Sequence, residues 1–483
     1  MNVTDRVQPP TIAELEADPI VRQLRSALEA ASAPEAEPCP LHAWTMTVTL
    51  RRGDQRLLHA GSDNALTVST LRENIREKSL SIQVYIQHPD TDALGTASLT
   101  VDPLRSLADQ IADAARAALT NQNPPWELPG PPAEPFRTVR TVDERLLEDP
   151  VAVTDELVRV ADGACRRLSG VKVNYAELFV NTSLKLTLTS TGLRLPRMGS
   201  DLYFEVAMEK LPLPNTQEVH NYRKSLDAQG LALAEFLNEA AEETLSLDKV
   251  ELPPTDESAV VLIHAPDINR ILHGLLDQCE AAREYNRLPF LSVGERIAVG
   301  EAVPDNEPLH IRLDPFVDLM ARTTAFTGEG LPAREGFIIE EGVIKAQRIS
   351  NRMGAYLGRE PNGLTGNIVM PAGKTPLDEL RRGADRVIEI VSFSSLLVNP
   401  DQLTWSSEIK LGRLHERTAD GWTVRPVKGG IVSGNIRENL SDCRWSRELG
   451  RHNSTADIFS GPEGYIGPAA WLVKSGVTIS GAE

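Results

Sequence analysis

His273 and Asp277, four residues apart, are the clearest candidates for chemistry in the sequence. Apolar residues recur around them at helical spacing: Ile268, Ile271, Leu272, Leu275, Leu276 and Cys279. A short apolar strand, residues 259–264, precedes this helix, and Asp267 is a favourable N-cap. At about 100° per residue, His273 faces away from the apolar stripe. The simplest interpretation is a solvent-exposed His–Asp pair that stabilises the helix slightly.

Other motifs that carry chemistry are absent or incomplete. The sequence has no Gly-x-x-x-x-Gly-Lys-Ser/Thr phosphate-binding loop and no Gly-x-Ser-x-Gly nucleophile turn. Gly328-Glu329-Gly330 begins like a dinucleotide-binding fingerprint, but Ala333 replaces the third glycine, so we expect a simple glycine turn. His415-Glu416 has no second histidine at a zinc-binding spacing, and we expect it on a hairpin strand.

The surrounding elements indicate an α+β fold. Period-two alternation predicts strands at 44–50, 80–86, 176–181, 185–190 and 202–208, and helical periodicity predicts helices at 104–119, 152–168 and 224–246. After Pro253-Pro254 the chain becomes rich in glycine and short strand-like pieces. We therefore predict a partly helical leader (1–40), an N-terminal α/β domain with a mixed sheet and flanking helices (41–252), and a β-rich C-terminal domain (253–483). One central helix, which carries His273, leads into the C-terminal domain.

Residues 123–135 are rich in proline. The composition favours an extended surface loop in the polyproline conformation. A partner-binding PxxP segment is the alternative.

Composition narrows the class of protein. The 483 residues include 68 acidic and 50 basic ones, a net charge of -18, which argues against binding to nucleic acid or to an anionic membrane. The sequence has no apolar run of the roughly 18–20 residues that span a bilayer and no apolar signal segment at its polar start, so we predict a cytoplasmic protein. The four cysteines, Cys39, Cys165, Cys279 and Cys443, are too far apart to suggest a disulfide framework or a zinc site.

Five short segments, in order, resemble the TldD/PmbA family, also called TldD/TldE. Residues 189–192 (TSTG) resemble its "NS.G" turn, and 259–262 with the following helix resemble its "VVL…LLH" entry to the central helix. Residues 328–332 with 338–344 resemble its "D.EG.P…LIE.GVL" block. Residues 365–367 with 370–371 resemble its "TGN…P" segment. Residues 416–435 resemble its "ENGKI..PV.G..L.GN" segment.

The resemblance implies a metallopeptidase scaffold. In the TldD branch, two histidines of a His-Glu-x-x-x-His motif on the central helix and a cysteine near the C-terminus hold zinc, and the glutamate takes a proton from the metal-bound water. The PmbA/TldE branch lacks these ligands. It pairs with a TldD-type subunit, and the cavity of the resulting heterodimer admits an extended peptide.

The zinc motif is not preserved in this chain. His273 occupies the place of the first histidine, but Gly274 replaces the glutamate and Gln278 replaces the second histidine. The cysteine position falls near Ser460, and His452 is a further residue that we expect near a cavity of this type. An amide and a hydroxyl are poor zinc ligands, and a single imidazole does not hold the ion. We therefore expect no catalytic residue and no metal ligand in this chain.

The sequence thus predicts a non-catalytic PmbA/TldE-type subunit of a heterodimeric zinc peptidase. Zinc is expected on the TldD-type partner, and a peptide or an amide-bonded metabolite is the expected substrate. A role in natural-product biosynthesis is one possible setting. The alternatives are a self-associating binding protein without peptidase activity and a metal-independent amide hydrolase.

Overall fold

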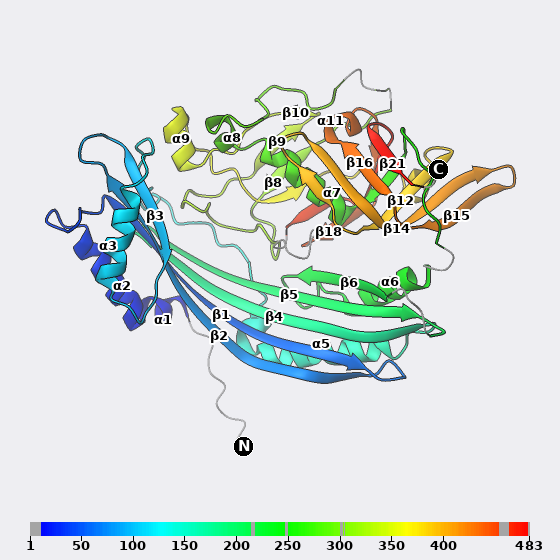
Figure 1. Ribbon diagram of the computed structural model, residues 1–483, viewed down its shortest axis with the longest axis horizontal. Helices are drawn as coiled ribbons and strands as arrows, with labels where there is room; N and C mark the ends of the chain where they lie inside the picture. The colour runs from blue at the N-terminus through cyan, green and yellow to red at the C-terminus, as the bar shows by residue number, and fades with distance from the viewer. Residues whose placement is uncertain are drawn as a thin grey trace.

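A computed structural model describes residues 11–213, 218–246, 250–299, 303, 305–453 and 463–481. Within these residues the chain forms two halves, and the long strands of the N-terminal half curve beneath the C-terminal half (Figure 1). The α+β fold class is therefore confirmed. No helix of the described residues is long and apolar enough to cross a membrane.

The N-terminal half is built on a sheet of order β3-β2-β1-β4-β5-β6. Its strands are β1 (Ala43–Ala60), β2 (Leu66–Gln87), β3 (Leu94–Thr100), β4 (Val171–Thr189), β5 (Arg194–Lys210) and β6 (Glu218–Ser225). Neighbouring strands in this sheet all pair antiparallel, so the sheet is not mixed as the sequence suggested. The predicted strands at 176–181 and 185–190 join into the single strand β4.

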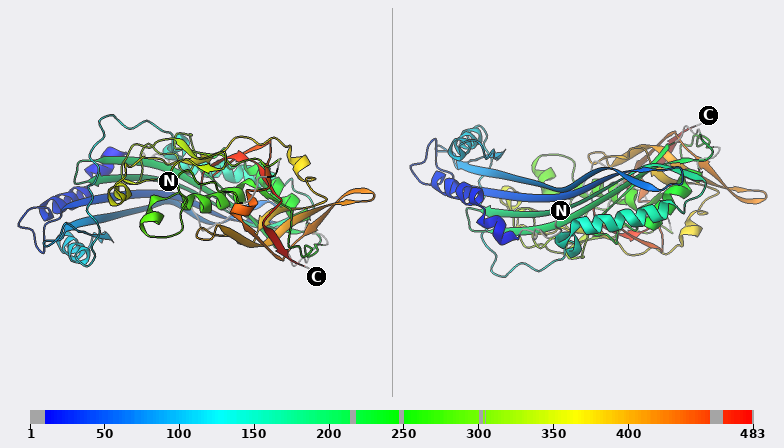
Figure 2. Two further views of the ribbon diagram at one scale, coloured as in Figure 1. Left: turned by 90° about the horizontal axis from the view of Figure 1, so that it is seen from above. Right: turned by 90° about the horizontal axis from the view of Figure 1, so that it is seen from below.

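All the packed helices of this half lie on one face of the sheet. They are α1 (Ile12–Ala17), α2 (Pro19–Ala31), α3 (Leu107–Ala118), α4 (Glu144–Glu148), α5 (Pro150–Cys165) and α6 (Leu233–Ser246). Even-numbered β4 residues meet the α5–α6 layer at one end, as at Leu178, and the α2–α3 layer at the other, as at Leu186. The view from below shows α5 lying along this face (Figure 2).

The predicted helix at 224–246 is shorter than expected. Residues 218–225 form β6, which pairs with β5, and α6 begins only at Leu233. Sheet pairing overrides local helical periodicity here, because the strand bonds satisfy the backbone at the edge of β5.

The other face of the N-terminal sheet turns toward the C-terminal half (Figure 1). Alternate residues of β1 and β4 point there, among them Thr45, Thr47, Lys185 and Thr187. The Oγ1 atoms of Thr47 and Thr187 lie 2.9 Å apart across the two strands. This face therefore forms a hydroxyl-rich boundary between the two halves.

The C-terminal half contains two sheets in the described residues. One has the order β10-β9-β8-β11-β19-β18 and the other β17-β20-β7-β12-β14-β16-β21, with β13 and β15 also paired to β14. The strands are β7 (Val261–His264), β8 (Ile311–Asp314), β9 (Gly336–Glu340), β10 (Val343–Ile344), β11 (Asn367–Val369), β12 (Arg386–Phe393), β13 (Leu397–Asn399), β14 (Thr404–Thr418), β15 (Gly421–Val427), β16 (Ile431–Asn435), β17 (Cys443–Trp445), β18 (Leu449–His452), β19 (Tyr465–Pro468), β20 (Ala470–Val473) and β21 (Val477–Ser480). The helices are α7 (Ala265–Asp277), α8 (Ala281–Tyr285), α9 (Asn351–Leu357), α10 (Leu377–Leu380) and α11 (Ile436–Asn439).

Helix α7 is the central helix that the sequence predicts. Its apolar stripe is fully buried in one core shared by strands of both C-terminal sheets. The helix begins at Ala265 with His264 as N-cap, so Asp267 lies within the first turn and is not the cap. The polar residues of α7 lie on the side of the helix opposite this stripe and contact the segments that pack there.

Candidate functional site

His273 projects from α7 toward the start of the C-terminal tail, where it meets Glu463. The ring Nε2 lies 3.2 Å from Glu463 Oε2, but off the line that a hydrogen bond requires, so the contact is electrostatic. Asp277 instead pairs with Arg283, at 3.3 Å. The prediction of a solvent-exposed His–Asp pair is therefore wrong, because each of the two residues contacts a different charged side chain.

Glu463 is held by Arg322, which lies in the loop after β8. The guanidinium binds both carboxylate oxygens, with Nε 2.7 Å from Oε2 and Nη2 on Oε1. Asn269, one turn before His273 and fully buried, donates from Nδ2 to the backbone oxygen of Glu463 at 3.3 Å, and its own Oδ1 has no partner in the described residues. The segment that carries Glu463 is thus joined to α7 through both its backbone and its side chain.

The electrostatics of this cluster keep His273 neutral. Burial lowers the pKa of His273 to about 4, and the charges of Arg322 and Arg348 act in the same direction, against the attraction of Glu463. Burial alone would raise the pKa of Glu463, but the hydrogen bonds and charge of Arg322 hold it below its ordinary value. The negative charge of Glu463 is therefore balanced by a guanidinium of the same chain.

Gly274 leaves no room for an acidic side chain. A Cβ atom at this position would lie 2.3 Å from Cγ1 of Val398, on β13. The neighbouring strand therefore fills the space beside the helix where the resemblance places a general base.

Gln278 is used to fix the turn between β13 and β14. Its Nε2 donates to the backbone oxygens of Pro400, at 2.5 Å, and of Asp401, at 3.3 Å. The side chain is buried. The amide therefore points to the turn and serves backbone carbonyls that would otherwise lack a donor.

These residues do not fit a zinc ion. The donor set at α7 is one imidazole and a carboxylate whose two oxygens are bound by Arg322. Zinc sites use three protein ligands or more, and a guanidinium against the carboxylate opposes a second cation there. In the part of the chain that the structure describes, no three His, Cys, Asp or Glu side chains are grouped to hold a metal. Ser460 lies outside the described residues.

His452 lies on β18, beside a different set of charged groups. Burial, with the charges of Arg223 and His264, lowers its pKa to about 4. Arg223 belongs to β6 of the N-terminal half, so His452 lies where the two halves meet. No described contact joins it to His273.

A second polar cluster, around Glu389 on β12, was missed by the sequence analysis. Glu389 is fully buried and lies 3.0 Å from His264 Nε2 and 2.9 Å from His415 Nε2, while Arg381 donates two hydrogen bonds to it. Burial alone would raise the pKa of Glu389, but these partners hold it well below its ordinary value. His264 and His415 are 125 and 26 residues away in sequence, so no local pattern links them to Glu389.

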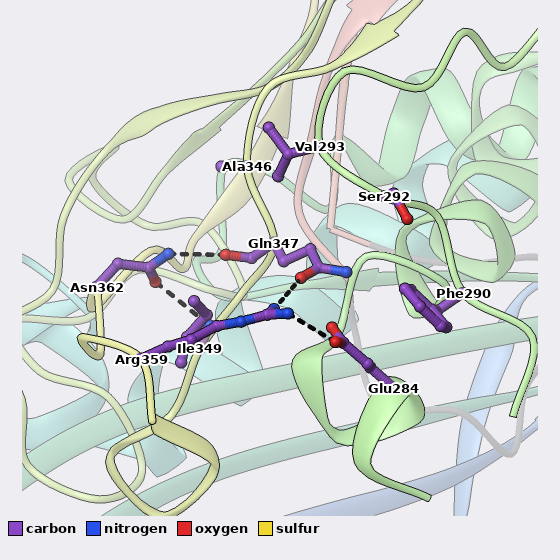
Figure 3. A pocket seen from close by; sticks show the side chains of 9 residues that line it. All are labelled: Glu284, Phe290, Ser292, Val293, Ala346, Gln347, Ile349, Arg359 and Asn362. Atoms are coloured by element: carbon purple, nitrogen blue, oxygen red, sulfur yellow. Dashed lines mark hydrogen bonds and ion pairs between the residues drawn. The ribbon is translucent and has the colours of Figure 1, made fainter. Parts of the chain in front are cut away.

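A surface pocket of about 440 Å³ opens beside α8 and is lined mostly by apolar atoms. Arg359 crosses it from Gln347 Oε1 to Glu284 Oε1, at 2.8 and 2.6 Å, and Asn362 binds the backbone of Gln347 (Figure 3). Most polar groups of this pocket are thus bonded to one another. We therefore interpret the pocket as a surface depression stabilised by internal hydrogen bonds and not as a ligand site.

The comparisons agree with the resemblance. Residues 261–481 match the family model described as the PmbA/TldA metallopeptidase C-terminal domain. TldE from Thermococcus kodakarensis has the same fold, with a TM-score of 0.70 and 18 % identity, over 95 % of this chain and 99 % of that one. A candidate modulator of DNA gyrase from Bacteroides thetaiotaomicron matches with a TM-score of 0.74 and 15 % identity, over 98 % and 100 %. A corresponding protein from Thermotoga maritima matches with a TM-score of 0.69 and 16 % identity, over 95 % and 100 %.

None of the curated proteins compared with the chain matches it. At such low identities the solved structures establish the fold alone. The family model matches residues of the C-terminal half only. Residues 261–481 of this chain are therefore similar to the C-terminal domain of that metallopeptidase family.

Proposed function

We propose that this protein is a non-catalytic, TldE-type subunit of a heterodimeric TldD/TldE-like zinc peptidase. The observation that carries the proposal is the polar side of α7. There Gly274 is closed off by Val398, Gln278 is bonded to the β13–β14 turn, and the carboxylate beside His273 is bound by Arg322. These three helix positions are thus used for packing, for hydrogen bonds to a turn and for contact with an internal ion pair.

The role left to such a subunit is to bind the partner and to form part of the substrate channel. The C-terminal half supplies edge strands, such as β18 in one sheet and β17 in the other. An extended peptide can add to a free strand edge through backbone hydrogen bonds. Zinc and the catalytic step would belong to the TldD-type partner, and a cytoplasmic location stays a prediction.

Direct action on DNA is not part of this proposal. The name of two of the similar structures mentions DNA gyrase, but a net charge of -18 opposes contact with a polyanion. A peptide or amide substrate is compatible with the charge and with the family.

The proposal is tested by co-expressing the chain with a TldD-type protein from the same genome. Size-exclusion chromatography with light scattering should give a one-to-one heterodimer, and elemental analysis should give about one zinc per heterodimer. The chain purified alone should carry no stoichiometric zinc. A stable homodimer that ignores the partner would contradict the proposal and favour the self-associating binding protein.

A metal-independent amide hydrolase is the second candidate, favoured by one observation. Glu389 orients the imidazole of His264, whose side chain is about a quarter exposed, as a carboxylate orients a general base in hydrolases. If this pair were catalytic, the chain alone would hydrolyse peptides in the presence of a chelator, and His264→Ala would abolish that activity. Absence of chelator-resistant activity would rule this candidate out.

A further inference from the structure

A cavity of about 300 Å³ lies between the N-terminal sheet and the C-terminal half. Strands β1, β2 and β4 form its floor, and Glu329 and Arg352, the latter on α9, form the opposite wall. The proline-rich segment 123–135, which we call the strap, closes one side with Trp126 and Leu128. Three distant parts of the chain therefore meet around one space.

The strap is without regular structure and mostly exposed, as expected of an extended surface loop, but it is anchored at several points. The backbone N–H and C=O of Asn123 both bond to Leu94, each at 2.9 Å. Asn351, at the start of α9, donates from Nδ2 to the backbone oxygen of Glu127 at 2.6 Å. Trp126 is consequently 7 % exposed. The strap is a built wall that joins the N-terminal sheet to the C-terminal half.

Trp126 brings an unsatisfied donor to this wall. Its ring packs edge-on against Tyr85, with centroids 5.6 Å apart and planes at 86°. Its Nε1 atom is shielded from solvent and has no hydrogen-bond partner among the residues that the structure describes. The indole N–H can only donate, and a buried unpaired donor costs about 1–3 kcal/mol. The wall of the cavity therefore includes an indole whose N–H is shielded from solvent.

Further donors face the same space without internal partners. In the described residues, neither the Lys185 ammonium nor the Arg352 guanidinium makes a hydrogen bond or an ion pair. Burial, with the nearby Glu329 carboxylate, raises the pKa of Tyr85 to about 12, so its hydroxyl keeps its proton. The one acidic group, Glu329, accepts the backbone N–H of Arg352 at 3.1 Å. Two cationic side chains therefore face this space together with one carboxylate.

We propose that this cavity binds the carboxylate of a short peptide. Lys185 and Arg352 supply the opposite charge, and the Trp126 ring forms the wall of the cavity. Glu329 and the threonine hydroxyls of the floor provide acceptors for amide N–H groups of the same ligand. The volume, at the lower end of the range for ligand sites, suits a chain end or one side chain with its neighbours. The choice of a peptide carboxylate rests on the proposed function, while the need for an anionic group follows from Lys185 and Arg352.

The test measures binding of defined peptides to the full chain alone by isothermal titration calorimetry. The probes are N-acetyl-trialanine with a free carboxylate, the same peptide as its C-terminal amide, and an N-acetyl tripeptide amide with a central glutamate. The free acid should bind, and the alanine amide should bind at least ten-fold more weakly. If the glutamate amide binds as well as the acid, the carboxylate site is supported and its source is a side chain; if only the acid binds, the source is the chain end.

Variants connect the binding to the cavity. Arg352→Gln should weaken binding of the acid at least ten-fold, and Lys185→Gln should weaken it several-fold. Arg22→Gln, on the exposed side of α2, is the matched control and should leave binding unchanged. Equal binding of acid and amide, unchanged binding by Arg352→Gln, or no binding at millimolar peptide would overturn the proposal. Because the chain is tested alone, failure to pair with a TldD-type partner would leave this result independent.

Discussion

The polar side of α7 and the cavity behind the strap contain similar charged groups, but within the described part of the chain these groups are paired in the first region and unpaired in the second. At α7 the chain satisfies its own charges, since Arg322 binds Glu463 through both oxygens. In the cavity, the charged side chains of Lys185 and Arg352 have no partner in the described residues. Groups that are paired internally contribute to stability, whereas unpaired groups around a space contribute to binding. Substitutions in the two regions should therefore separate these two properties.

The largest effect on stability is expected for Gly274→Ala. The new Cβ would overlap Cγ1 of Val398, and overpacking of this kind costs about 1–3 kcal/mol of unfolding free energy. Urea unfolding of the purified chain measures it.

Two further variants show whether the cost comes from that contact. Gly163→Ala, in α5, is the control, because its Cβ would approach only Arg167 Nη1, at 3.7 Å, and should be neutral or slightly stabilising. Val398→Ala combined with Gly274→Ala should recover part of the loss. If Gly274→Ala unfolds like the wild type, the space beside α7 is open and our account of the missing base is wrong.

Gln278→Ala should lower the unfolding free energy by about 1–2 kcal/mol. The change removes the buried side-chain donor to the backbone oxygens of Pro400 and Asp401. Urea unfolding gives the size of the effect, and hydrogen exchange should rise at the β13–β14 turn. Gln278→Glu offers a comparison that keeps the shape and removes the N–H donors. An effect no larger than that of an exposed substitution would mean that the amide does not fix the turn.

Arg322→Met should cost about 1 kcal/mol at neutral pH, since the arginine is half exposed and solvent weakens the pair. The pKa of Glu463 is lowered in the folded chain, so its contribution is present above the ordinary glutamate pKa of about 4.3 and is lost as the pH falls through the folded value. The difference between wild type and variant should therefore shrink below about pH 4.3. Arg382→Met, at an exposed position, should show no such difference. A difference that is constant with pH would contradict the ion pair.

Arg352→Gln should have the smallest effect on stability, within about 0.5 kcal/mol, because no internal bond of its guanidinium is lost. Thermal unfolding of the free chain measures this, with Arg322→Met in parallel. A loss as large as that of Arg322→Met would show that Arg352 is a structural residue, and the contrast between the two regions would fail.

Local patterns predicted the fold class and the central helix well. The stripe from Ile268 to Cys279 has helical period because one side of α7 is buried in the C-terminal core. His273, Gly274 and Gln278 could likewise be placed, because positions on one helix have a fixed geometry. The same periodicity misassigned 224–225, where pairing with β5 prevailed.

The partners of the site could not be predicted, because they come from far along the chain. Glu463 and Arg322 lie 141 residues apart, and neither belongs to a motif that names the other. The one available signal was the glycine-rich setting of Glu463, close to the position compared with the family's cysteine. For the strap, the signal was Trp126, because a large apolar side chain within a proline-rich segment favours burial of that part of the segment.

In the function that we propose, zinc and catalysis belong to the partner subunit. The most direct test is the zinc content and peptidase rate of the co-purified heterodimer with His273→Ala in this chain, compared with the unaltered heterodimer. We predict the same zinc, about one ion per heterodimer, and the same rate within two-fold, because His273 is a neutral group beside an internal ion pair. A loss of zinc together with activity in the His273→Ala complex would show that this chain holds the metal and would contradict the account.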